Sequence, residues 1–147
     1  MSNKTANTLN DLVEALNDGI AFYDHAAKET QDASHQDLFR NMSRLKSIIA
    51  ADLKTEVARQ GETPANDSSW LGEFRQGYAD LKAKLAKDPD ATYVAALEAQ
   101  EDRVLHAFRD AVDGDQPARV RELASTYLPQ VRDMHDRMRA LKQAKQA

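Results

Sequence analysis

Apolar residues recur along most of the chain at steps of three and four, the spacing that places side chains on one face of an α-helix. Four long stretches have this pattern, at about 8–30, 34–60, 89–113 and 117–143, and a shorter, aromatic-rich stretch covers 69–87. No stretch of useful length alternates apolar and polar residues, as β-strands do. The pattern therefore predicts an all-α protein in which residues 1–147 form a single helical-bundle domain.

Capping and stop residues set the expected helix boundaries. Thr8 and Ser34 are the expected N-caps of the first two helices. Asp88 followed by Pro89 predicts the start of a later helix, because a proline in the first helical position loses no hydrogen bond. Gly61 is expected to stop the second helix.

The lengths of the links predict the topology. Short links make the first two long helices antiparallel neighbours, and likewise the last two. The stretch between these pairs is long, and a helix of ~18 residues within it would span roughly 27 Å, about the length of the bundle. We therefore expect two antiparallel helical hairpins with a long helical crossover between the second and third bundle helices.

Composition narrows the class of protein. The net charge of −4 argues against a nucleic-acid-binding surface, and the absence of cysteine excludes disulfides and thiolate catalysis. No stretch approaches the ~18 consecutive apolar residues of a membrane span, and the first residues do not form a secretory signal. We expect a cytoplasmic protein with no membrane or nucleic-acid partner.

Glu101 is the main candidate for a functional residue, because it lies between Leu97 and Val104 on an apolar helix face. A buried carboxylate is costly unless a metal, a positive charge or hydrogen-bond donors satisfy it. Tyr23 and Tyr127 lie on inward faces at a similar height, so we expect a buried polar cluster of Tyr23, Glu101 and Tyr127. In that case Glu101→Gln should leave the melting temperature unchanged or raise it. The alternative is a remnant site for a small ligand or a single ion.

Histidines offer few further ligands. His25, His35, His106 and His135 form no spaced ligand pair, and His35 is expected to be solvated in the first turn of its helix.

Three short motifs point to a family. They are Asp80-Leu-Lys82 in an aromatic-containing crossover, Glu98-Ala-Gln-Glu-Asp102, and the closing segment His135-Asp-Arg-Met-Arg-Ala-Leu141. With these motifs, the chain resembles bacterial ferritin-like proteins of unknown function over nearly its whole length. The resemblance implies a ferritin-like four-helix bundle and a link to stress responses.

The resemblance also implies where a metal would lie. Ferritin-like di-iron proteins use a Glu from each of two helices and a Glu-x-x-His motif from each of the other two. Here only Glu101 matches, and Ile20 stands where the family has an acidic residue. The expected site is therefore a degenerate di-iron site, with Glu101 as the one ligand and Glu98 and His135 as possible neighbours.

Two classes of function follow. The first is a non-enzymatic ferritin-like bundle that acts as a binding or scaffold module, without a cofactor. The second is an oxidoreductase or metal-storage protein that binds iron or manganese through Asp24, Glu98, Glu101 and His135. The chain is also a candidate homo-oligomer that would pair through Trp70 and Phe74.

Overall fold

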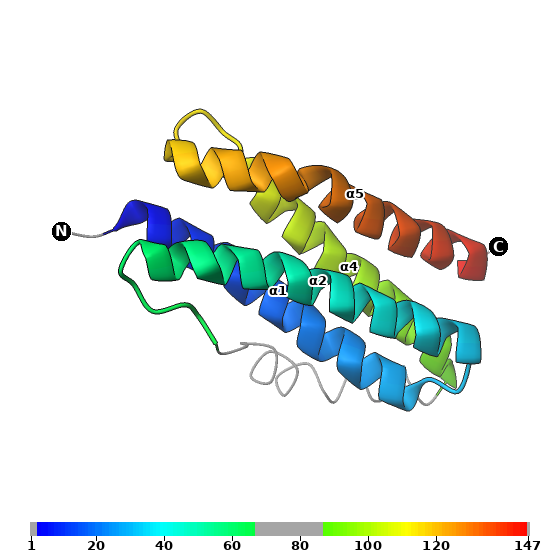
Figure 1. Cartoon of the computed structure of the whole chain (residues 1–147). Helices are drawn as coiled ribbons and strands as arrows, with labels where there is room; N and C mark the ends of the chain where they lie inside the picture. The colour runs from blue at the N-terminus through cyan, green and yellow to red at the C-terminus, as the bar shows by residue number, and fades with distance from the viewer. Residues whose placement is uncertain (1–2, 67–86, 147) are drawn as a thin grey trace.

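The computed structural model describes residues 3–66 and 87–146. Within these residues the chain forms four helices and no strands: α1 (Lys4–Glu29), α2 (Ala33–Arg59), α4 (Pro89–Ala111) and α5 (Ala118–Gln146) (Figure 1). The predicted all-α class is confirmed. The predicted crossover at 69–87, including Trp70 and Phe74, falls almost entirely outside the described residues.

Both helices of the first hairpin begin earlier than predicted. The cap of α1 is Asn3, whose side chain accepts a hydrogen bond from Ala6 N at 3.0 Å, so the predicted cap at Thr8 is wrong. Asn3 Nδ2 also donates to the carbonyl oxygen of Gln60 at 3.1 Å. This contact with the end of α2 favours an early start that local patterning does not reveal. The cap of α2 is Asp32 rather than Ser34.

Other predicted boundaries are confirmed. Gly61 follows the end of α2 with a φ of 79°, a left-handed conformation that glycine adopts without steric cost. Asp88 caps α4 by accepting from Ala91 N at 3.1 Å, and Pro89 takes the first position of the helix.

The four described helices pack as two antiparallel hairpins, α1 with α2 and α4 with α5 (Figure 1). The two hairpins meet mainly between α1 and α4. Helix α5 makes fewer contacts with the first hairpin than α4 does. Helices α2 and α4 begin at the same end of the bundle and run in the same direction (Figure 1). This brings the α1–α2 turn close to the start of α4.

One apolar core runs through the bundle. Its largest fully buried apolar side chains are Tyr23, Phe39, Phe108, Leu9, Leu16, Met42, Ile49, Leu53, Leu97, Met134 and Met138. In the part of the chain that the structure describes, no helix has both the length and the apolar character needed to cross a bilayer.

Candidate functional site

Glu101 is buried, as its place on an apolar face predicts, and its partner is a lysine. Glu101 on α4 is 1 % exposed, and Lys46 on α2 is completely buried. The Lys46 ammonium forms an ion pair with Glu101 Oε1. Lys46 points inward because it shares the buried face of α2 with Met42, Ile49 and Ala50. The pair therefore joins the two hairpins in the middle of the core.

Tyr23 and Gly19 of α1 complete the surroundings of this pair. The Lys46 ammonium lies 5.9 Å from the centre of the Tyr23 ring, within the range of a cation–π contact. Burial raises the pKa of the Tyr23 hydroxyl well above its usual value, and the nearby charge of Glu101 raises it further. Gly19 leaves room for the lysine, because a Cβ at this position would lie 3.1 Å from Lys46 Cδ. We refer to Tyr23, Lys46 and Glu101 as the interior cluster.

The interior cluster does not fit a di-metal centre. It offers one carboxylate, and a lysine ammonium already contacts an oxygen of that carboxylate. A cation bound to the same oxygen would lie beside the ammonium charge, at several kcal/mol of repulsion or more in a dry interior. A charged pair of this kind neutralises the buried acid without an ion.

The predicted third member of the cluster lies elsewhere. Tyr127 of α5 is partly exposed, and its hydroxyl donates a hydrogen bond to Asp52 of α2. This bond, together with some burial, raises the pKa of Tyr127 to about 12. Lys46, rather than Tyr127, is the ion-pair partner of Glu101.

The other predicted metal neighbours gather on α4 and α5, away from Glu101. His135 is 6 % exposed, and its Nε2 lies 3.0 Å from Asp102 Oδ1 and 4.0 Å from Glu98 Oε1. Its Nδ1 lies 3.1 Å from Asp136 Oδ1, so both ring nitrogens have a partner. Glu98 also pairs with Lys142 at 3.6 Å. These contacts describe an interhelical polar network, in which the imidazole is already engaged.

Asp24 belongs to neither group. It is exposed and accepts a hydrogen bond from Ser43 Oγ at 2.6 Å.

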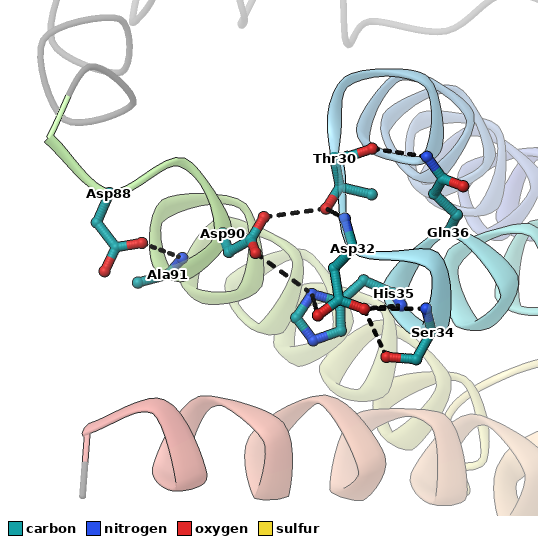
Figure 2. Close-up of polar contacts among 8 residues, drawn as sticks. All are labelled: Thr30, Asp32, Ser34, His35, Gln36, Asp88, Asp90 and Ala91. Carbon is teal, nitrogen blue, oxygen red and sulfur yellow. Dashed lines mark hydrogen bonds and ion pairs between the residues drawn. The ribbon is translucent and has the colours of Figure 1, made fainter.

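A further cluster closes the end of the bundle where the α1–α2 turn meets the start of α4 (Figure 2). His35 is 8 % exposed, so the expectation that it is solvated is wrong. Its ring lies against Phe39, with the two centroids 5.8 Å apart. His35 Nδ1 lies 4.0 Å from Asp32 Oδ2 and 4.0 Å from Asp90 Oδ2. We refer to Asp32, His35 and Asp90 as the end cluster.

The sequence of the chain matches a known protein family. The model of a family described as "Domain of unknown function (DUF2383)" matches residues 4–114, about three quarters of the chain. The chain belongs to this family. No curated protein matches it.

The DUF2383 match covers α1, α2 and α4 and ends before α5. Both the interior cluster and the end cluster lie entirely within the matched residues. Tyr127 and His135 lie outside it. The family description assigns no activity, and the interior cluster and the end cluster are the features that bear on function.

The spacing of residues along α2 contains a signal for two buried positions that the sequence analysis did not single out, Lys46 of the interior cluster and His35 of the end cluster. His35, Phe39, Met42, Lys46, Ile49 and Leu53 recur at steps of three and four, and all six are buried. Apolar spacing alone groups Met42, Ile49, Leu53 and Val57, which are buried, with Leu38 and Leu45, which are only partly buried. Because lysine and histidine are usually assigned to the surface, apolar spacing leaves His35 and Lys46 out of this face.

Proposed function

We propose that the chain is a ferritin-like helical bundle that acts as a non-enzymatic binding or scaffold module. The ferritin-like assignment is supported by the sequence resemblance and by the shared direction of α2 and α4 (Figure 1). In this proposal the degenerate di-iron site is a structural remnant, and no iron or manganese is required.

The observation that supports the proposal best is the Lys46–Glu101 ion pair. A ferritin-like di-iron site needs several inward carboxylates and imidazoles around two cations. Among the described core residues, the neighbour of Glu101 is a fixed positive charge instead of a second acid. A lysine in this position opposes metal binding at Glu101.

A test compares iron oxidation by the wild-type chain and by Glu101→Gln. The proposal predicts that Fe²⁺ added to purified protein is oxidised no faster than in buffer, for both proteins. If the wild type accelerates the oxidation of Fe²⁺ and Glu101→Gln does not, the scaffold proposal is wrong and the chain is an oxidoreductase.

A metal-binding function is the second candidate, favoured by one observation. Glu98, Asp102 and His135 each offer a ligand atom, and these atoms lie within 4.8 Å of one another. Elemental analysis of protein purified without chelator tests this candidate. Stoichiometric iron or manganese that is lost in His135→Gln would support it over the scaffold proposal.

A further inference from the structure

The end cluster contains a buried imidazole nitrogen without a hydrogen-bond partner. His35 Nδ1 is buried, and no donor or acceptor in the described structure lies within bonding distance of it. An N–H in this position would normally approach a carboxylate to about 2.9 Å, and here each of the two facing oxygens is 4.0 Å away. An unpaired polar atom in a buried position is costly, so a missing partner is expected.

The two carboxylates are held with one oxygen engaged and the other directed toward His35 (Figure 2). Asp90 Oδ1 accepts a hydrogen bond from Thr30 Oγ1 at 2.9 Å. Asp32 Oδ1 accepts from Ser34 Oγ at 2.6 Å and from two backbone N–H groups of the first turn of α2. Such outer contacts orient the ligands of metal sites.

Acidic side chains gather at this end of the bundle and offset the positive ends of the α2 and α4 helix dipoles. Glu29 and Asp88 line a surface hollow of about 280 Å³ that Asp90 also lines. Two additional carboxylates therefore lie beside one of the three residues of the end cluster.

We propose that Asp32, His35 and Asp90 bind one divalent first-row transition-metal ion, which joins the α1–α2 turn to the start of α4. The ligand atoms are Asp32 Oδ2, His35 Nδ1 and Asp90 Oδ2, which lie within 4.8 Å of one another. Zn²⁺ binds nitrogen and carboxylate oxygen at about 2.0–2.2 Å, so two of its ligands are roughly 3.4 Å apart in a tetrahedral site. Metal binding would require the two carboxylates to rotate so that the 4.0 Å separations shorten to that value. Water completes the coordination.

This proposal does not depend on the proposed scaffold function, because the end cluster and Glu101 share no residue. The ion would be structural, linking the two hairpins at the end of the bundle.

The test is calorimetric titration of the full chain with Zn²⁺ after removal of bound metal. We expect one ion per chain and a rise in melting temperature of about 3 °C or more at saturating Zn²⁺. Asp90→Asn should weaken Zn²⁺ binding by more than about tenfold, while the asparagine still accepts the Thr30 hydrogen bond. His35→Gln should do the same, and melting without zinc checks that each variant folds.

Three matched variants separate this site from the others. His106→Gln removes an exposed histidine of α4, His135→Gln removes the histidine of the α4–α5 network, and Glu101→Gln removes the interior acid. Each should retain the wild-type affinity for Zn²⁺. Absence of binding by the wild type, equal binding by Asp90→Asn, or loss of binding in His135→Gln would overturn the proposal.

The hydrogen bond from Thr30 to Asp90 allows a second test of the proposed site. Thr30→Val removes the hydroxyl that orients Asp90 and should weaken Zn²⁺ binding about tenfold. Mg²⁺ at the same concentration should not compete, because it prefers sites made of oxygen ligands alone. Effective competition by Mg²⁺ would show that the imidazole is not a ligand.

Discussion

At the scale of single residues, the interior ion pair makes the sharpest prediction. Lys46→Met should lower the free energy of unfolding by about 3–5 kcal/mol, because Glu101 would remain buried without its counter-charge. Urea denaturation followed by circular dichroism measures this difference.

The control for this prediction replaces both partners. Lys46→Met with Glu101→Leu removes both charges and keeps similar volumes, so its stability should lie near that of the wild type or above it. A double variant as unstable as Lys46→Met alone would contradict the idea that the unpaired carboxylate causes the loss.

The same pair reverses an expectation drawn from the sequence. With tyrosine donors as its only partners, Glu101→Gln would leave the melting temperature unchanged or raise it. With Lys46 as partner, the substitution leaves a buried ammonium without a counter-charge, so the melting temperature should fall.

Residue patterning could predict that Glu101 and Tyr23 are buried, because both lie on clear apolar faces. Apolar spacing alone did not predict Lys46 as the partner of Glu101, because a lysine is usually assigned to the surface. The positions of the two residues along α2 and α4 do not by themselves show that they meet. Contact between two helices depends on a rotation of about 100° per residue, which height alone does not determine.

At the scale of helices, Gly19 of α1 is predicted to make room for the side chain of Lys46 on α2. Gly19→Ala ordinarily gains about 1 kcal/mol of helix stability. Here the new Cβ would lie 3.1 Å from Lys46 Cδ and 3.3 Å from Cε. Because the ion pair holds that side chain in place, crowding should outweigh the gain and lower stability by about 1 kcal/mol. Urea denaturation measures the change.

A double-mutant comparison isolates this effect. In the Lys46→Met, Glu101→Leu background the flexible methionine is free to move, so Gly19→Ala should become neutral or stabilising. An identical effect of Gly19→Ala in both backgrounds would show that the glycine does not act through Lys46.

Three helix boundaries were predicted correctly from local signals, whereas the caps of α1 and α2 were not. Asp88, Pro89 and Gly61 act within their own turn, and all three take the predicted roles. Asn3 caps α1 while also bonding to Gln60, which is 57 residues away in the sequence. No local pattern contains that contact.

At the scale of the whole molecule, polar contacts join the two hairpins along the bundle, and three of them mark its two ends and its middle. Thr30 bonds Asp90 at one end, Lys46 pairs with Glu101 in the middle, and Arg119 at the start of α5 pairs with Glu56 near the end of α2. The order of these contacts follows from α2 and α4 running in the same direction. Link lengths predicted that direction, whereas the chemistry of each contact depended on rotations that the sequence did not reveal.

The contact between Glu56 and Arg119, at the start of α5, predicts how the stability of the fold changes at acid pH. Glu56 accepts hydrogen bonds from Gln60 at 3.0 Å and from Arg119 at 2.7 Å, and these lower its pKa below the usual value. A lowered pKa means that the folded state favours the ionised form. Glu56 therefore stabilises the fold above the usual glutamate pKa of about 4.3, and this stabilisation is lost as the pH falls below that value.

Glu56→Gln should accordingly be less stable than the wild type at pH 7 and lose less stability on acidification, so the two proteins converge below about pH 4. Thermal melts across pH 2–7 measure this. Glu62→Gln, at an exposed position just past the same helix end, is the matched control and should follow the wild-type curve. Parallel curves for Glu56→Gln and the wild type would mean that the Glu56–Arg119 contact does not hold α5 to the first hairpin. In that case the attachment of α5 would depend on apolar packing and on the Tyr127–Asp52 bond.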